Sequence, residues 1–479
     1  MNIQPRRLRV ALARLTAGPW RLLRAGRVAV TWAARKARGA GTRARSWAGG
    51  LRPEQHLILG FLSYALLGSA LLSLPAARKG DDALIDNIFT SVSAVSTTGL
   101  STISLSEHYT FFGQVVVLVL FQLGGIGYMT VSSVVVLARG GSLSQTRSGV
   151  LHAGFSIPRN FVPGRFLVHV VVFTLVAELT GSIVLWRRFD ALGVPDPLWS
   201  GIFHAVSAFA TAGFSLNADS LERFSGDWVV CTTIGTLCYL GAIGFIVVQD
   251  VWYSVRFRER MLTFTSRVIL SMTLVIFGLG TLGVLALDDS LGELPAGQRA
   301  LAAGFQVMSA STTAGFNTIP VASLATTSLV ALSIAMIVGA SPSGTGGGMK
   351  TTGVSALLAT LVSILRRRDC VRWMGHEIPM LRVLAAVATA VLYLTLLLAG
   401  VLALSITERG SIERLAFEAT SAIGTVGLSL GATGELSTPG KVIVIILMFA
   451  GRTGPMTLGL ALLRPDPTPP TARLDDLAV

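Results

Sequence analysis

The chain has 479 residues, of which 52% are hydrophobic and 13% charged, and its formal net charge is +14. A soluble domain carries about twice that share of charged residues, so this composition excludes one and indicates a polytopic membrane protein. Three cysteines, Cys231, Cys238 and Cys370, offer no disulfide framework. The first two fall inside an apolar stretch, where packing is the expected role.

The beginning of the chain is basic, with arginines from Arg6 to Arg52 and no acid before Glu54. Its length, and the lack of a small-residue cleavage site after a short apolar core, argue against a secretory signal. Trp20 and Trp32 interleave with arginines, which fits a helix on an anionic leaflet as well as a disordered tail. We expect 1–54 to be cytoplasmic and to contact membrane lipids, with no nucleic acid as a partner.

Apolar runs that can cross a bilayer, which takes about 20 residues, follow in chain order. They lie at 57–74, 112–137, 166–186, 228–252, 268–287, 327–340, 383–405 and 441–463. The sixth is short, but a second helical stretch follows it after a Gly-rich break. Four moderately apolar stretches, at 83–94, 197–208, 298–310 and 411–422, are too short to cross, which predicts re-entrant helices.

Basic residues mark the linkers after the second, fourth and sixth runs: Arg139, Arg147, Arg159, Arg256, Arg258, Arg260, Arg366, Arg367, Arg368 and Arg372. By the positive-inside rule these linkers face the cytoplasm. The opposite loops are richer in acids, which favours the approach of cations. An even number of spans returns the chain to the cytoplasm, where we expect the Pro-rich tail 464–479 to be disordered.

One short pattern, Ser-Ala-x-x-Thr-x-Gly-(Leu/Phe)-(Ser/Asn), occurs four times without gaps, at 93–101, 207–215, 309–317 and 421–429. A phenylalanine stands four residues before each serine, at Phe89, Phe203, Phe305 and Phe417. Non-helical backbone at bilayer depth is tolerated only where it lines a cavity, so four such loops predict one central pore. Simple helix packing by Gly and Ser suits a single copy better than four aligned copies.

The centre of each copy is uncharged, which leaves backbone carbonyls to meet an ion, and carbonyls prefer cations. The expected filter residues are Thr97, Thr98, Gly99, Thr211, Ala212, Gly213, Thr313, Ala314, Gly315, Thr425, Val426 and Gly427. Glycine permits backbone angles that are closed to other residues. The short helix before each loop would add the negative end of its dipole.

These four Thr-x-Gly loops resemble the filters of the Trk/Ktr/HKT superfamily of potassium transporters, and the resemblance spans roughly residues 55–463. It implies an all-α membrane protein of four membrane-pore-membrane units, with eight transmembrane helices and four re-entrant pore helices around one pore. The units would be 55–137, 138–252, 253–364 and 365–463. The resemblance also implies that the filter carbonyls bind potassium as the transported substrate, and that two chains form a homodimer.

Gly-rich sequences weaken the returning spans at 124–127, 241–244, 339–342 and 451–454. In the third unit the weakness extends over 339–348, too rich in Gly and too polar for a continuous helix, and it resembles the family's intramembrane gate loop. A phosphate-binding loop at 344–351 is disfavoured, because Met349 replaces a glycine and no strand precedes it. The expected gate residues are Gly339, Ser341, Ser343, Gly344, Thr345, Gly346, Gly347, Gly348, Lys350 and Arg452.

Three ionisable residues fall within or beside apolar spans. Arg452 is costly there, so we expect it to face the pore; packing or snorkelling is the alternative. The resemblance implies that it projects below the filter, where its fixed positive charge would raise the barrier to cations. Lys350 fits an anchor for the gate loop and an interface residue equally well. For Glu178 we favour a hydrogen-bonded structural role over a coupling site.

The wording of the gate loop and of 451–455 resembles the Ktr membrane subunit more than the Trk one, which carries an additional pair of spans; we expect no span before residue 55. This resemblance implies a cytoplasmic ring of nucleotide-binding regulatory subunits, since the chain has no Rossmann fingerprint or other sign of an organic cofactor. We expect potassium uptake across the plasma (inner) membrane, with both termini cytoplasmic. Sodium-coupled symport, with sodium as a second ion, stays open. An enzyme or scaffold is disfavoured because the histidines are scattered.

Overall fold

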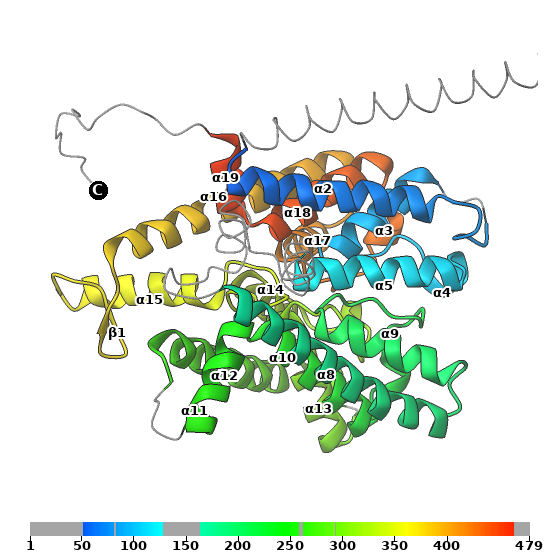
Figure 1. The fold of residues 1–479 in the computed structure, drawn as a ribbon, viewed down its shortest axis with the longest axis horizontal. Coiled ribbons are helices and arrows are strands. Elements are labelled where there is room, and N and C mark those ends of the chain that lie inside the picture. The colour runs from blue at the N-terminus through cyan, green and yellow to red at the C-terminus, as the bar shows by residue number, and fades with distance from the viewer. Residues whose placement is uncertain (1–50, 81–82, 128–162, 258–261, 293, 464–479) are drawn as a thin grey trace, which may run out of the picture. The chain divides into compact units, whose positions relative to one another are not determined.

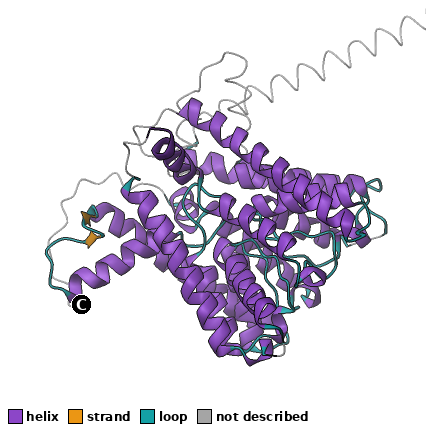
Figure 2. Cartoon of the chain, turned by 90° about the horizontal axis from the view of Figure 1, so that it is seen from below, coloured by secondary structure: helices purple, strands orange, loops and turns teal. Residues whose placement is uncertain are grey.

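The computed structural model of the protein describes residues 51–80, 83–127, 163–257, 262–292 and 294–463. The chain divides into residues 1–56, of which only the last six are described, and residues 57–479, which hold the fold. Regular structure in the described part is almost entirely helical (Figure 2). The basic segment up to residue 50, the linker arginines from Arg139 to Arg159, Arg258, Arg260 and the tail 464–479 lie outside the described residues.

Helices follow one another along the chain with short loops between most of them (Figure 1). The α-helices are α2 (Pro53–Leu72), α3 (Leu84–Val95), α4 (Leu105–His108), α5 (Phe111–Ile126), α8 (Pro163–Ala191), α9 (Pro197–Phe209), α10 (Trp228–Ala242), α11 (Phe245–Phe257), α12 (Phe264–Leu287), α13 (Ala296–Thr312), α14 (Thr326–Val338), α15 (Thr351–Leu365), α16 (Met380–Thr407), α17 (Ile412–Gly424), α18 (Thr438–Thr453) and α19 (Pro455–Leu462). Two strands, β1 (Arg372–Trp373) and β2 (His376–Glu377), pair antiparallel between α15 and α16.

Four helices, α3, α9, α13 and α17, occupy the stretches predicted to be re-entrant, and we call them the pore helices. Each packs on the helix that follows its loop, which is α5, α10, α14 or α18 in turn. Each of these following helices also packs on a pore helix of the next unit: α5 on α9, α10 on α13, α14 on α17, and α18 back on α3. The last contact joins the end of the fold to its beginning, so the four repeats form a closed ring.

Of the described helices, four are long and apolar enough to cross a membrane, and up to six if each of two bent pairs is one span. The bent pairs are α10 with α11, at 97°, and α18 with α19, at 94°. These bends fall at the predicted weak points 241–244 and 451–454 of the apolar runs 228–252 and 441–463. Gly244 and Gly454 break them with φ of 94° and 83°, angles that favour glycine, and Pro455 follows the second break.

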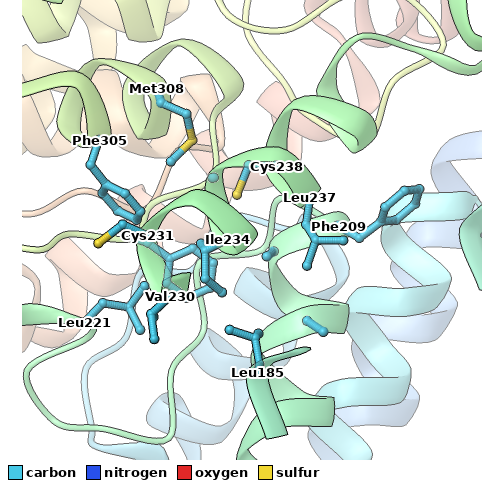
Figure 3. Close-up of a cluster of buried hydrophobic side chains, with 14 of the residues drawn as sticks. Leu185, Phe209, Leu221, Val230, Cys231, Ile234, Leu237, Cys238, Phe305 and Met308 are labelled. Carbon is cyan, nitrogen blue, oxygen red and sulfur yellow. The ribbon is translucent and has the colours of Figure 1, made fainter. Parts of the chain in front are cut away.

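Buried apolar side chains fill the space between the helices. One cluster joins α8, α9 and α10 of the second unit to α13 of the third, and Figure 3 shows Leu185, Phe209, Ile234 and Met308 among its residues. Cys231 and Cys238 belong to the same cluster, are 2% and 0% exposed, and carry free thiols. The packing role predicted for these cysteines agrees with this position, because an unpaired buried cysteine behaves as a small apolar residue.

The repeated phenylalanines hold the pore helices to four different parts of the core. Phe203 belongs to a cluster of the first two units, and Phe305 to the cluster that joins the second and third units. Phe89 belongs to a cluster of the first and fourth units, and Phe417 to one of the third and fourth. Each pore helix is thus fixed by its own buried aromatic ring, and the repeated loop pattern begins at its C-terminal end.

Candidate ion pathway

Each pore helix ends in the same backbone turn, and the repeated pattern explains it. The threonine that opens each triplet, at 97, 211, 313 or 425, has a left-handed φ between 49° and 58°. Its N–H donates to the alanine carbonyl three residues earlier at 3.0–3.3 Å, and the next N–H donates to the serine carbonyl at 2.8–2.9 Å. These two bonds define a Schellman turn, so the Ser-Ala-x-x-Thr spacing encodes a helix end.

After the turn, the four triplets, which we call loops 1 to 4, meet each other edge to edge. A Cβ added to Gly99 would lie 2.4 Å from the carbonyl oxygen of Ala212, in loop 2. A Cβ added to Gly213 would lie 2.6 Å from the Ala314 oxygen, and one added to Gly315 would lie 2.2 Å from the Val426 oxygen. A Cβ added to Gly427 would lie 2.2 Å from the Thr98 oxygen, which closes the circle.

The four glycines are therefore required twice, by conformation and by space. Their φ angles are 86°, 69°, 78° and 97° in loops 1 to 4, and L side chains rarely adopt such angles. Their missing Cβ atoms are where the carbonyl of the next loop sits. The arrangement brings twelve residues from four distant parts of the sequence into one ring of backbone, with the middle-residue carbonyls at its contacts.

Residues 339–350 leave the helical path between α14 and α15 and form a loop, which we call the unit-3 loop. It folds back on itself through Ala340 N–H, which donates to the Gly347 carbonyl at 3.1 Å. Ser341 and Thr345 donate their N–H groups to the carbonyls of Ala242 and Gly241, each at 3.0 Å. The loop is therefore fixed to the broken end of α10 rather than packed as a span.

The unit-3 loop also touches the first threonine of each of loops 1 to 4. The Thr211 hydroxyl donates to the Thr345 hydroxyl at 3.0 Å, and the Gly347 N–H donates to the Thr313 hydroxyl at 2.9 Å. The Thr97 hydroxyl donates to the Thr345 carbonyl at 3.4 Å. A Cβ on Gly347 would lie 2.1 Å from Thr425 Oγ1. The glycine run lets this backbone lie against all four loops at once.

Arg452, near the end of α18, lies at the junction of two of these elements. Its Nη1 donates to the Thr97 hydroxyl at 3.0 Å and to the carbonyl of Thr345, and its Nη2 donates to the carbonyl of Gly124. Phe61 places its ring centroid 6.0 Å from the guanidinium carbon. The arginine thus faces the interior, hydrogen-bonded to loop 1, to the unit-3 loop and to α5.

Two further ionisable residues singled out in the sequence have defined partners. Lys350 donates from Nζ to the Gly346 carbonyl within the unit-3 loop, so of the two roles considered the anchor fits its position. Glu178 on α8 is 6% exposed and accepts from Gln122 Nε2 on α5 at 2.8 and 2.9 Å. That contact ties the first unit to the second, as a structural acid would.

Several buried or half-buried polar contacts around the pore helices were not predicted from the sequence. Lys441 on α18 forms an ion pair with Asp86 on α3, 2.6 Å between Nζ and Oδ1. Glu418 and His204, both 0% exposed, hydrogen-bond the residues that follow loops 4 and 2. One signal was present: Glu418 and His204 each directly follow a repeated phenylalanine, a position that is polar in all four copies.

The chain is similar to known proteins over most of its length. Residues 63–467 match TrkH, the family described as cation transport protein. The chain belongs to the TrkH family. The resemblance inferred from the four loops is thereby confirmed, as is the expectation that the chain is a transporter and not an enzyme.

Curated relatives of this TrkH-family chain match over most of its length. It is 33% identical over 417 residues to Ktr system potassium uptake protein B of Vibrio alginolyticus, covering 86% of this chain and 91% of that one. It is 34% identical to the Bacillus subtilis protein of the same name, covering 85% and 92%. It is 31% identical to potassium/sodium uptake protein NtpJ of Enterococcus hirae, covering 86% and 93%.

The potassium transporter TrkH from Vibrio parahaemolyticus has a similar solved structure, with a TM-score of 0.68. The match covers 85% of this chain and 83% of that one at 20% sequence identity. At that identity the likeness shows a shared fold. The ring of pore helices described above is therefore a TrkH-type membrane fold.

Proposed function

We propose that this TrkH-family protein takes up potassium across the plasma membrane through loops 1 to 4. The observation that carries the proposal is the closed circle of contacts in which each filter glycine abuts the carbonyl oxygen of the next loop. Four uncharged backbone segments on one axis can replace the hydration shell of a monovalent cation. The relatives named for potassium uptake support potassium as that cation.

In this proposal the four repeats are membrane-pore-membrane units with eight crossings, and both termini lie in the cytoplasm. The four pore helices would point their C-terminal ends at the filter, where the negative ends of their dipoles favour a cation. The broken α10–α11 and α18–α19 pairs would each count as one returning crossing. The shorter α5 and α14 would serve the same purpose in the first and third units.

The unit-3 loop is proposed as the gate, because it contacts the threonine at the base of every loop. Potassium leaving the filter would have to displace Thr345, whose carbonyl is held by Arg452. Arg452 also places a fixed positive charge below the filter, and like charges repel strongly away from bulk water. Gating would then be the release of the loop from these partners.

Regulation is proposed to come from outside this chain. The two relatives named as protein B of a Ktr system point to a further component, and we propose a cytoplasmic ring of nucleotide-binding subunits and a homodimer of this chain. Pull-down of the tagged protein from its native membrane tests both points. Recovery of a single copy of the chain with no soluble nucleotide-binding protein would reject them.

Purified protein in liposomes tests the main proposal. With the membrane voltage set by a pH gradient and a protonophore, rubidium uptake should follow the voltage without any sodium present, and excess external sodium should compete poorly. Equal competition by sodium and potassium would contradict potassium selectivity.

A second candidate is sodium-coupled potassium symport through the same loops. It is favoured by the 31% identity to a protein named for both potassium and sodium uptake. Uptake that requires a sodium gradient, with a fixed ratio of the two ions, would support it over the voltage-driven pathway.

A further inference from the structure

The residue after each repeated phenylalanine is polar and fully buried behind the filter. The four residues are Thr90, His204, Gln306 and Glu418, and each is 0% exposed. Burying a polar side chain costs free energy unless it forms hydrogen bonds. The partners of each residue therefore indicate what this position does in each unit.

Glu418 gathers donors from the segment just after loop 4. Its Oε1 accepts from the Leu430 N–H at 3.0 Å and from the Ser429 hydroxyl, and its Oε2 accepts from the Thr433 hydroxyl at 2.6 Å. The Ser429 oxygen in turn accepts from the Gly431 N–H at 2.9 Å. The carboxylate thus binds pore helix α17 to the outer flank of its own loop through three bonds.

His204 does the same for loop 2 with a different side chain. Its Nε2 lies 2.9 Å from the hydroxyl of Ser215, which holds the same place in its repeat as Ser429. Its Nδ1 lies 2.8 Å from the Ser200 carbonyl, one helical turn back. The Ser215 hydroxyl also donates to the Ser220 carbonyl at 3.1 Å, so His204 is joined through Ser215 to the segment that follows loop 2.

The motif serines show the same division between the units. The Ser207 hydroxyl donates to the Phe214 carbonyl at 2.8 Å, and the Ser421 hydroxyl accepts from the Gly427 N–H at 3.0 Å. In the other two units the equivalent side-chain atoms have no hydrogen-bond partner within the part of the chain that the structure describes: Thr90 Oγ1, Ser93 Oγ, Gln306 Nε2, Gln306 Oε1 and Ser309 Oγ.

The circle of glycine contacts places loop 2 opposite loop 4. A ring built from four similar repeats is thus braced from behind on one diagonal, by residues 204, 207, 418 and 421, and not on the other. In the described part of the chain, loops 1 and 3 lack side-chain hydrogen bonds from these two repeat positions. Farther out, Thr102 donates to Asp86 at 2.7 Å and Asn317 donates to Glu222 at 2.8 Å.

We propose that Glu418 and His204 are positioning residues that hold opposite filter loops from behind and thereby set the preference for potassium over sodium. The proposal rests on the proposed function of loops 1 to 4. A filter distinguishes two ions of equal charge through the placement of its carbonyls, so a brace that fixes two of four loops fixes half of the carbonyl ring.

Glu418→Gln is the principal test. The amide keeps the volume but replaces one acceptor by a donor that faces other donors, and buried donors without partners are costly. In liposomes we expect the potassium-to-sodium flux ratio to fall by about tenfold or more, the scale of one lost buried bond. Glu418→Asp, which keeps both acceptors, should recover part of the ratio.

Gln306→Leu is the matched control, since it changes the same repeat position on the unbraced diagonal. We expect its flux ratio to stay within about twofold of the unchanged protein, the effect of a neutral substitution. His204→Phe keeps an aromatic side chain but removes the Nε2 contact with Ser215, and its ratio should fall like that of Glu418→Gln. A preserved ratio in Glu418→Gln, or an equal fall in Gln306→Leu, overturns the proposal.

Amide hydrogen exchange separates this proposal from the proposed function. Residues 427–433 should exchange faster in Glu418→Gln and at the unchanged rate in Gln306→Leu. If the unchanged protein proves unselective, the proposed function fails, yet the exchange result still judges the brace. Equal exchange in both variants rejects the brace whatever ion is transported.

Discussion

The Arg452 guanidinium donates to the Thr97 hydroxyl, with 3.0 Å between Nη1 and Oγ1, although 355 residues separate the two in sequence. The same Nη1 donates to the Thr345 carbonyl. One side chain from the fourth unit thus touches the first threonine of loop 1 and the unit-3 loop. Any movement of the unit-3 loop has to break or stretch a bond to this arginine.

Arg452→Ala tests its charge. In the proposed function this side chain places a fixed positive charge next to the filter, so we expect its removal to raise cation flux in liposomes by about tenfold, which corresponds to about 1.4 kcal/mol less barrier. Arg414→Ala, which removes a peripheral arginine paired with Glu435, should leave flux unchanged. Flux at or below the unchanged level in properly assembled Arg452→Ala protein would contradict the barrier role.

Gly315→Ala tests the closed circle. An alanine there must adopt a φ near 78° with its Cβ 2.2 Å from the Val426 oxygen, so the ring has to open. We expect loss of potassium selectivity by about tenfold or more, since strain of this kind costs about 1–3 kcal/mol. Gly353→Ala on α15, where a Cβ meets nothing within 4 Å, is the matched control. Equal selectivity in the two variants would speak against the loops as the filter.

The position of Glu222 beside Asn317, which follows loop 3, predicts a pH dependence of flux. Burial raises the pKa of Glu222 above its ordinary value, and the charge of Asp219 adds to this while the Asn317 hydrogen bond opposes it. Asp219 itself lies 3.7 Å from Arg223. As pH falls through the raised pKa the negative charge beside Asn317 is lost, so potassium flux should decline at a higher pH than an ordinary glutamate would give.

The control for this effect is Glu222→Gln, whose flux should be low and show no step in the same pH range. The contribution of Glu222 to the free energy of unfolding changes with pH in the opposite direction to the flux. A raised carboxyl pKa means that the folded protein holds the proton more tightly, so this group's contribution to stability falls as pH rises between the ordinary and the raised pKa. A step of equal size in Glu222→Gln would assign the titration to another group.

Lys441→Met tests the seam between the fourth and first units. Lys441 and Asp86 are 15% and 11% exposed in their side chains, and removing one partner of such a pair leaves a charge uncompensated. We expect the free energy of unfolding to fall by about 3–5 kcal/mol, seen as a lower midpoint of thermal unfolding in detergent. Arg414→Met, at a more exposed pair, should cost about 1 kcal/mol or less. Adding Asp86→Asn to Lys441→Met should restore part of the loss; additive losses would reject the pair.

The fourfold repeat made the pore helices and loops 1 to 4 predictable from the sequence. The predicted re-entrant stretches coincide with α3, α9, α13 and α17 to within two residues at each end, because a Schellman turn leaves a fixed residue spacing. Glycines in the sequence marked the break at Gly244. They did not predict the 97° bend between α10 and α11, because a bend angle depends on what the second helix packs against. Contacts such as Lys441 with Asp86 have no local pattern, because they join elements that only the closed ring brings together.

The circular contact of glycine with carbonyl has a direction, since each loop presses on the next and is pressed by the one before. A change in one loop should therefore reach one neighbour first. Substitutions at Gly99 and Gly213 share a contact and should couple in a double-variant cycle, whereas those at Gly99 and Gly315 share none and should add. Four loops in one chain can then diverge singly, with each glycine position constrained first by the one carbonyl oxygen that it meets.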